Sequence, residues 1–275
     1  MRIWFITGCS SGLGAGIAKA VLKSGDAAVV TARARERVRH FEMEYPDRAL
    51  AVSMDLADRE TMKEAVQAAF EKFGRIDVLV NNAGHGYRAA IEESEPGQVR
   101  QLFEEDFFSP MEIIRMVLPK MREAHNGLII NVTSIGAVSG ALGNGYYSAA
   151  KGALELATEA LKKEVEPFGI RTMLIEPGAM RTGFYGERMV GTNTTISAYD
   201  DIAVNYRKEK IVNRHDQIGD PDRCGKIIVR TAFAENAPFR LLLGSDAVTA
   251  AEAVLIDRIR ELRTWKSVSI QSDYK

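Results

Sequence analysis

The first strand and turn of the chain read Ile3-Trp4-Phe5-Ile6-Thr7-Gly8-Cys9-Ser10-Ser11-Gly12-Leu13-Gly14. Gly8 permits a turn that a Cβ atom would block, Gly12 lets the backbone approach a pyrophosphate, and Gly14 allows the following helix to pack closely on a sheet. The N–H groups and dipole at the start of such a helix favour phosphate. The spacing G-x-x-x-G-x-G is weak evidence alone, but its place after an N-terminal strand supports a dinucleotide site that includes Ser10, Ser11 and Leu13.

Beyond this turn, short apolar runs alternate with amphipathic segments along the rest of the chain. Strands are expected at residues 3–6, 27–32, 49–54, 78–81, 128–132, 172–176 and 240–243. Helices are expected at residues 13–24, 58–74, 96–121, 147–168, 222–235 and 247–264. The strands are continuously apolar, which is typical of a parallel sheet covered on both faces. The pattern predicts an α/β fold, with one doubly wound, Rossmann-type domain and a mostly parallel seven-stranded sheet.

One segment does not follow this alternation of strands and helices. Residues 183–219 form a polar and aromatic insertion that we expect to be partly helical over 198–212. Long insertions of this kind are usually binding loops or lids, although some are merely mobile, and we favour a substrate lid. Aromatic and apolar side chains of the insertion are candidates for the pocket lining or for packing the insertion down: Phe184, Tyr185, Met189, Tyr199 and Tyr206. No linker or repeat divides the chain, so we expect one domain over residues 1–275.

Composition excludes several classes of function. The 275 residues carry a formal net charge of −1, so no long-range field attracts nucleic acid or an anionic membrane. No run approaches the roughly 18 apolar residues of a membrane span, and the N-terminal strand leaves no room for a leader. Cys9 and Cys224 do not suggest a disulfide framework. We therefore expect a cytoplasmic protein with no metal site.

The residue after the second strand distinguishes the two nicotinamide dinucleotides. An acidic residue there binds the ribose 2′-hydroxyl of NAD, whereas an arginine accommodates the 2′-phosphate of NADP. The sequence is Thr31-Ala32-Arg33, and the first carboxylate nearby is Glu36. Arg35 and Arg37 fit a solvated helix face, so Arg33 is the candidate phosphate ligand. The sequence predicts that NADP(H) is preferred, with NAD(H) possible.

Tyr147 and Lys151 lie four residues apart on a predicted helix and therefore share one face. A phenol has an ordinary pKa of about 10, and a neighbouring ammonium stabilises the phenolate. Tyr147 is thus a candidate general acid in reduction and base in oxidation. Ser134 ends an apolar strand and could hold the substrate oxygen beside Tyr147, or simply serve in a turn.

Together these motifs resemble the short-chain dehydrogenase/reductase family in its short, single-domain form. The matching residues are Thr7-Gly8-x-x-x-Gly12-x-Gly14, Asp55-Leu56, Asn81-Asn82-Ala83-Gly84, Ser134, Tyr147-x-x-x-Lys151 and Pro177-Gly178. Residues 176–182 and 241–246 look most like soluble bacterial members related to 17β-hydroxysteroid and retinol dehydrogenases. The resemblance implies an NAD(P)(H)-dependent oxidoreductase that interconverts a carbonyl and a secondary alcohol.

The resemblance also implies a role for each matching residue. Asp55 and Leu56 would flank the adenine, and Lys151 would bind the nicotinamide ribose and lower the pKa of Tyr147. The remaining cofactor contacts would come from Asn82, Ala83, Gly84, Pro177, Gly178 and Thr182. Homodimers or homotetramers formed through the helices at 96–121 and 147–168 are also implied.

One position departs from the family pattern. The segment Phe103-Glu104-Glu105-Asp106-Phe107-Phe108 aligns with a place where the family normally carries Asn, at Asp106. That Asn holds a water that links the catalytic lysine to solvent. Asp106 can accept a hydrogen bond, but when ionised it cannot donate one, and it would stabilise the Lys151 ammonium. We expect a working relay with altered pH dependence; tolerated drift, or a surface residue in a shifted alignment, is the alternative.

Two other functions share the fold. A cofactor-binding regulator without turnover would typically lack Tyr147 or Lys151, and both are present. An isomerase or dehydratase with a transient nicotinamide remains open, because it would keep the same residues. His85 and Tyr87 could reach the pocket, but we interpret His85 as solvated. The small-molecule substrate, its stereochemistry and the physiological direction are not readable from the sequence.

Overall fold

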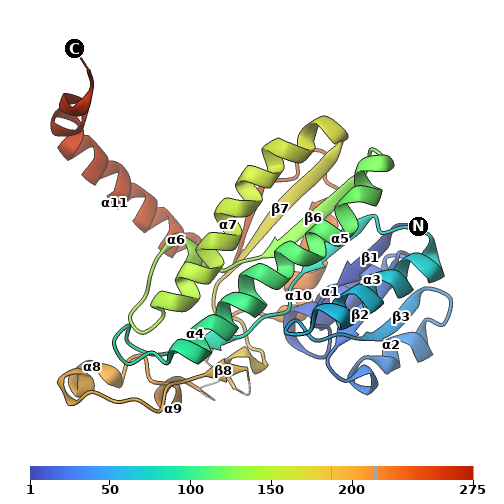
Figure 1. Cartoon of the computed structure of the whole chain (residues 1–275), viewed down its shortest axis with the longest axis horizontal. Coiled ribbons are helices and arrows are strands. Elements are labelled where there is room, and N and C mark those ends of the chain that lie inside the picture. Colours follow the sequence, from blue (N-terminus) through green and yellow to red (C-terminus); the bar gives the residue numbers. More distant parts are fainter. Residues whose placement is uncertain (187, 213–215, 275) are drawn as a thin grey trace.

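Seven parallel strands form the main sheet, in the order β3-β2-β1-β4-β6-β7-β9 (Figure 1). The computed structural model describes residues 1–186, 188–212 and 216–274. The strands of this sheet are β1 (Ile3–Ile6), β2 (Ala27–Ala32), β3 (Ala49–Ser53), β4 (Val78–Asn81), β6 (Gly127–Val132), β7 (Ile170–Pro177) and β9 (Arg240–Leu243). The strand order reverses between β1 and β4, as in a doubly wound fold. The expected fold class is confirmed, and the strand ends lie within two residues of their expected positions.

Helices cover both faces of this sheet. Those described are α1 (Gly12–Lys23), α2 (Arg39–Glu44), α3 (Arg59–Phe73), α4 (Pro96–Phe103), α5 (Ser109–Glu123), α6 (Ile135–Val138), α7 (Gly145–Val165), α8 (Asp200–Ala203), α9 (Lys208–Ile211), α10 (Pro221–Ala232) and α11 (Ser245–Ser269). Successive side chains of a strand point to opposite faces, so β1 contributes to two cores. Trp4 and Ile6 pack with α1 and α10, while Phe5 packs with α3, α5 and α7. The polar turns are thus left at the strand ends, where a site can form.

The expected helix over 96–121 is not one continuous α-helix. Residues 104–108 between α4 and α5 form a π-helical turn, which places Asp106 in the protein interior. Elsewhere the capping signals are confirmed. The Asp58 carboxylate accepts a hydrogen bond from the Glu60 backbone N–H at the start of α3, and Gly74 ends that helix at φ 76°. A left-handed residue of this kind favours glycine because it has no Cβ atom.

The insertion over 183–219 is partly helical, as expected. Within it lie α8, α9 and the strand β8 (Met189–Val190). β8 pairs in parallel with β5 (Gly86–Tyr87), forming a small second sheet that the sequence did not reveal. This pairing fastens the start of the insertion beside the segment that follows β4.

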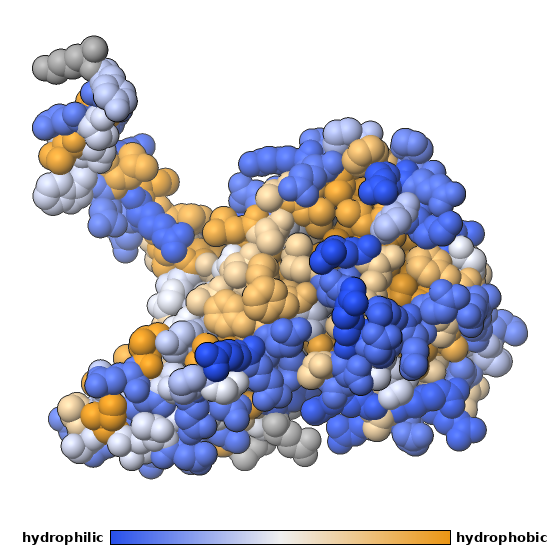
Figure 2. Space-filling view, viewed as in Figure 1, coloured by the Kyte–Doolittle hydropathy of each residue, from blue (hydrophilic) through white to orange (hydrophobic). Residues whose placement is uncertain are grey.

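α11 projects away from the body of the protein (Figure 1). Ala247 and Ala251, near its start, are its buried residues, and every residue from Leu255 to Ser269 is exposed. Figure 2 shows apolar residues along this arm as well as polar ones. Among the described residues, no helix combines the length and the apolar character needed to cross a bilayer.

Candidate active site

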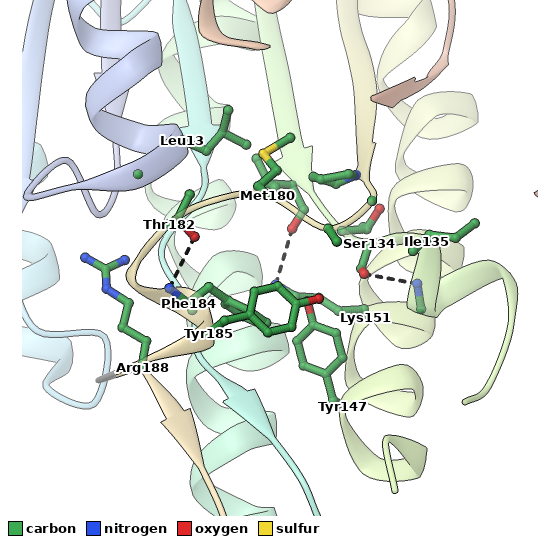
Figure 3. Close-up of a pocket in the computed structure, with 18 of the residues that line it drawn as sticks. Leu13, Ser134, Ile135, Tyr147, Lys151, Met180, Thr182, Phe184, Tyr185 and Arg188 are labelled. Atoms are coloured by element: carbon green, nitrogen blue, oxygen red, sulfur yellow. Dashed lines mark hydrogen bonds between the residues drawn. The ribbon is translucent and has the colours of Figure 1, made fainter. Parts of the chain in front are cut away.

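A cavity of about 400 Å³ lies at the carboxyl ends of the central strands (Figure 3). Its wall includes the turn after β1, the segment after β4, the end of β6 and the segment after β7. In open α/β sheets this edge, beside the reversal of strand order, is where ligands bind. Polar side chains from segments far apart in the sequence meet there.

The glycine turn is shaped by its neighbours. Gly8 and Gly12 have φ values of 74° and 62°, a region that side chains with a Cβ atom rarely adopt. A Cβ atom on Gly8 would also lie 2.9 Å from Ala83. The Thr7 hydroxyl accepts hydrogen bonds from the backbone N–H groups of Asn82 (2.9 Å) and Ala83 (2.8 Å). The turn and the segment after β4 are therefore fixed together.

The start of α1 is available to a ligand. Ser11 is the N-cap residue, but its side chain makes no capping hydrogen bond in the described structure. Ser11, Gly12 and Leu13 line the cavity. A helix N-terminus with free N–H groups is a favourable place for a phosphate. A Cβ atom on Gly14 would overlap the Gly8 carbonyl and crowd the Asn82 amide, so Gly14 keeps the helix close to the turn rather than touching the cavity.

Tyr147 and Ser134 face the same space in the cavity (Figure 3). Tyr147 belongs to α7 and is 7% exposed; Lys151 lies one turn later and is 5% exposed. The Lys151 Nζ is 5.9 Å from the centroid of the Tyr147 ring. Ser134 lies two residues after the end of β6, as the extended N-cap residue of α6, and its Oγ accepts a hydrogen bond from the Gly136 N–H (3.0 Å). The structure thus brings the three expected catalytic side chains into one cavity.

Lys151 has a buried counterion. Its Nζ lies 3.2 Å from the Asp106 Oδ2 and donates a hydrogen bond to the Val132 carbonyl (3.3 Å). Asp106 is fully buried, and its Oδ1 accepts a hydrogen bond from the His85 backbone N–H (3.0 Å). Asp106 is therefore not a surface residue; it lies beside Lys151, a residue of the cavity lining.

This ion pair changes the electrostatics of Tyr147. Burial raises the pKa of the Tyr147 phenol above its ordinary value, and the Asp106 charge raises it further, while Ser134 and Arg88 oppose the change. The pKa of Tyr147 is thus raised overall, by burial first and by the Asp106 charge second, and not lowered as expected from Lys151. The phenol is therefore protonated near neutral pH and can donate a proton, and additional positive charge at the site would favour the phenolate.

The expected cofactor and catalytic residues divide into two groups. Those that line the cavity are Ser11, Gly12, Leu13, Asn82, Gly84, Ser134, Tyr147, Lys151, Pro177, Gly178 and Thr182. Those that lie outside its lining are Gly8, Ser10, Gly14, Ala83, Arg33, Asp55, Leu56 and Asp106. Asp55 and Leu56 follow β3, and the Asp55 carboxylate accepts a hydrogen bond from the Ala57 N–H (3.0 Å).

Arg33 and Arg35 differ in their contacts. Arg35 donates hydrogen bonds to the Ala51 carbonyl (2.9 Å) and the Glu42 carboxylate (2.6 Å), so its side chain supports the local structure. Arg33 follows β2 directly and is exposed. Since β2 is adjacent to β1, Arg33 lies at the same sheet edge as the glycine turn.

The structure adds two basic side chains, Arg88 and Arg188, to the cavity lining and places a third, His85, in the nearby interior. Arg188 of the insertion donates hydrogen bonds to the hydroxyls of Ser10 (2.8 Å) and Ser11 (3.4 Å), so the insertion contacts the glycine turn. Arg88 lines the cavity. His85 is buried rather than solvated, and its Nδ1 lies 3.0 Å from Glu105. Burial lowers the pKa of His85, but the hydrogen bond with Glu105 and the Asp106 charge more than compensate and raise it overall.

The aromatic residues of the insertion have different roles. Phe184 and Tyr185 line the cavity. Met189 and Tyr206 are buried outside it, and Tyr199 donates a hydrogen bond to Glu92 (2.7 Å). The expected lining is therefore correct for two of the five residues.

Glu93 fastens the insertion to the body. It is fully buried and accepts hydrogen bonds from the Ile196 N–H (3.0 Å), the Tyr206 hydroxyl (2.8 Å) and the Arg207 guanidinium (3.0 Å). Burial alone would raise the pKa of Glu93, but these hydrogen bonds and the Arg207 charge hold it below its ordinary value. Tyr87 is buried as well, and its hydroxyl accepts a hydrogen bond from the Glu95 N–H (3.0 Å). Glu93 thus holds the insertion in place, Tyr87 holds the segment that follows β5, and neither residue lines the cavity.

The described residues hold no cluster of three or more His, Cys, Asp or Glu side chains suited to a metal ion. Cys9 and Cys224 are free and buried. The polar side chains that line the cavity include hydroxyl, amide, ammonium and guanidinium groups and the carboxylate of Asp246.

Comparison with known proteins gives a consistent result. The family model described as short chain dehydrogenase matches residues 2–190. "Oxidoreductase BOA17" of Botryotinia fuckeliana is 32% identical over 98% of this chain and 99% of its own length. A "3-ketodihydrosphingosine reductase" of Bacteroides thetaiotaomicron is 34% identical over 88% of each chain. The crystal structure of a short-chain dehydrogenase from Streptomyces avermitilis is 36% identical, with a TM-score of 0.90 over 99% of this chain and 98% of that one.

Proposed function

The chain belongs to the short-chain dehydrogenase family, and we propose that it transfers a hydride between a nicotinamide dinucleotide and a carbonyl or secondary alcohol. The observation that carries this proposal is the meeting of Ser134, Tyr147 and Lys151 in one cavity with the glycine turn. A regulator without turnover would have no need of a buried, ionisable phenol aimed into such a cavity.

The cavity fits a dinucleotide. The positive φ values of Gly8 and Gly12 and the uncapped start of α1 form a cradle that side chains would fill. Gly12 and Leu13 would bind the pyrophosphate through backbone N–H groups, Asn82 and Lys151 the nicotinamide-side ribose, and Thr182 the carboxamide. The bound nicotinamide supplies the hydride in reduction and accepts it in oxidation.

The residues of the chain would then manage the substrate oxygen and its proton. Ser134 would donate a hydrogen bond to that oxygen and hold it beside Tyr147. The Tyr147 phenol would donate the proton as the carbonyl carbon is reduced, because burial keeps it protonated. Lys151 would share its charge between the ribose and the developing phenolate, with Asp106 3.2 Å away as its counterion.

We further propose a preference for NADP(H) over NAD(H). Arg33 is exposed at the end of β2, at the sheet edge that carries the glycine turn, where it is free to reach a 2′-phosphate. The buried, free thiols of Cys9 and Cys224 suit the reducing cytoplasm, in which we place the protein. We also propose a homo-oligomer formed through α4, α5 and α7; Phe108 and Leu156, on this surface, are 53% and 68% exposed.

The proposed activity is tested by a panel of ketones and secondary alcohols assayed with each cofactor. Ketones should consume one equivalent of NADPH, and alcohols should reduce NADP⁺. An isomerase or dehydratase would convert its substrate without net change in the cofactor, so the stoichiometry separates the alternatives. The proposal would be contradicted if NADPH binds tightly but no ketone in the panel causes net oxidation of NADPH.

A further inference from the structure

Arg88 occupies a fixed position in the wall of the cavity. It follows β5 directly, and its backbone N–H donates a hydrogen bond to the Val190 carbonyl (2.9 Å), which ties it to the β5–β8 pair. The side chain lines the cavity together with Tyr147 and Tyr185. Arg188, by contrast, contacts the glycine turn. The two arginines therefore serve different ends of the same cavity.

The Arg88 guanidinium has no counterion within the described ranges 1–186, 188–212 and 216–274. Its Nε is buried without a hydrogen-bond partner, and burial lowers the pKa of the group. Among the described residues, the neighbours that stabilise its charge are the phenols of Tyr185 and Tyr147, not a carboxylate. Asp246 also lines the cavity, but its Oδ2 accepts a hydrogen bond from the Ala179 N–H (2.7 Å), and its Oδ1 has no hydrogen-bond partner among the described residues.

An unpaired charge that is partly removed from water is costly to the folded protein. A ligand anion that enters the cavity would recover this cost, because a guanidinium binds carboxylates and phosphates through paired, charge-assisted hydrogen bonds. Apolar ketones and alcohols would leave Arg88 unpaired. The group is thus a means of selecting anionic compounds over neutral ones of the same shape.

We propose that the substrate is an anionic oxo or hydroxy compound whose carboxylate or phosphate binds Arg88 while its reacting oxygen lies between Ser134 and Tyr147. This inference rests on the proposed function, since it uses the same cavity. The chemical class of the substrate is thereby added to the proposed function. The anionic group that binds Arg88 and the carbon that exchanges the hydride belong to the same substrate molecule. Arg88 is then a residue that determines specificity.

The test compares matched compounds. The probes are 5-oxohexanoate, its neutral methyl ester, and the phosphate monoester of 5-hydroxypentan-2-one. The wild type should favour an anionic probe over the ester by about tenfold or more in kcat/KM, mostly through KM. Arg88→Gln should bring this ratio close to one, and Arg88→Lys should keep part of it. Arg100→Gln, which removes an exposed charge from α4, should leave the ratio unchanged. A preference for the carboxylate or for the phosphate identifies which anion is bound.

A ratio near one in the wild type, or a ratio that Arg88→Gln does not alter, would overturn the inference. If no ketone is reduced at all, the proposed function fails. The role of Arg88 in anion binding is then tested separately, by measuring ligand binding without turnover. Calorimetry should then show hexanoate binding at least tenfold more tightly than hexanamide, in an Arg88-dependent manner. Equal binding of the two compounds would overturn it. Unchanged NADPH affinity in Arg88→Gln is expected, and a large loss would instead assign Arg88 to the cofactor.

A separate observation concerns the projecting helix α11. Val248, Leu255, Ile259 and Leu262 follow one another at intervals of seven, four and three residues and are 48–67% exposed. Such spacing places them on one stripe of the helix, the pattern of a helix–helix seam. Trp265, beside this stripe, is 58% exposed. An arm of this kind is stabilised by packing its apolar stripe against a partner.

The charges of α11 indicate which partner. Its first half, residues 245–257, carries three carboxylates and no basic residue: Asp246, Glu252 and Asp257. Its second half, residues 258–269, carries four basic residues and one carboxylate: Arg258, Arg260, Arg263, Lys266 and Glu261. Two copies that cross antiparallel near Ile259 would set Glu252 of each copy against Lys266 of the other. A parallel pair would oppose like charges along its whole length.

We infer that α11 pairs with the α11 of a second copy of this chain in an antiparallel, two-fold symmetric contact. Substituting both Leu255→Asp and Leu262→Asp should halve the mass of the assembly measured by light scattering at the same concentration. Glu252→Lys and Lys266→Glu should each weaken the assembly, and the two together should restore it. Thr264→Asp, on the opposite side of the helix, is the control and should leave the mass unchanged.

A wild-type mass of 30.3 kDa would overturn this second inference. An assembly that keeps its mass in the Leu255→Asp, Leu262→Asp variant would show that another surface holds it together. Failure of the paired charge exchange to restore what each single exchange weakens would rule out the antiparallel arrangement.

Discussion

Replacing Arg33 by Asp should reverse the cofactor preference of the protein. Arg33 is exposed, so its attraction to the 2′-phosphate of NADPH acts through water: about 1 kcal/mol per unit charge at roughly 4 Å. The phosphate carries about −1.5 to −2 charges, and part of the gain is lost in ordering two flexible groups. A preference of about tenfold for NADPH over NADH, or about 1.4 kcal/mol, is therefore expected in the wild type.

In Arg33→Asp this attraction becomes a repulsion of similar size, so the ratio of the two dissociation constants should change by about a hundredfold in total. The new carboxylate can also accept hydrogen bonds from the NADH ribose. The assay is a fluorescence titration of the protein with NADPH and with NADH, at about 0.1 M and about 1 M salt, because screening should shrink the preference.

The matched control is Arg37→Asp, which makes the same change of net charge at an exposed position of the same segment. It should alter the ratio of dissociation constants by less than about threefold, since its charge is solvated and farther from the sheet edge. Equal or tighter binding of NADH by the wild type would refute the assignment. Equal effects of the Arg33 and Arg37 substitutions would show that general charge, rather than a phosphate contact, sets the preference.

Three further substitutions test the ion pairs. Lys151→Met should weaken NADPH binding and also lower the free energy of unfolding by about 3 kcal/mol, because it strands the buried Asp106; urea denaturation measures this, and full stability would contradict the pairing. Asp106→Asn should remain active, and removing its charge should lower the pKa of Tyr147, moving the alkaline limb of the reductive kcat–pH profile to lower pH; superimposable profiles would show that Asp106 does not tune the phenol. Glu93→Gln should destabilise the protein by about 2 to 4 kcal/mol at pH 7, against less than about 1 kcal/mol for the exposed neighbour Glu92→Gln. Since the folded state lowers the pKa of Glu93, the deficit should shrink as the pH falls through that pKa, and a deficit that grows instead would contradict the sign.

The sheet was predictable because its strands are continuously apolar and its helix ends carry local signals. Asp58 and Gly74 cap α3 as the sequence predicted, since capping depends on residues adjacent in the chain. The approach of Ser134, Tyr147 and Lys151 followed from their places at a strand end and on one helix face. Local rules were sufficient for each of these features.

Contacts between distant segments were not predictable in the same way. The π-helical turn at 104–108 was not predicted, and the approach of Asp106 to Lys151 was expected from the family resemblance rather than from any local pattern. His85 was expected in solvent because its partner, Glu105, is twenty residues away. Arg188 meets Ser10 across 178 positions of sequence. Each of these two side chains acquires its role from a partner that only the folded chain reveals.

The most direct test of the proposed mechanism is the turnover of Tyr147→Phe. The substitution removes the proton-donating oxygen and keeps the ring that packs against Phe184, at 5.7 Å between centroids. NADPH should bind with a dissociation constant within about twofold of the wild type, while kcat for ketone reduction should fall by at least about a hundredfold. Intact NADPH binding with near-wild-type turnover would show that the proton comes from another group, and the account of the site would be wrong.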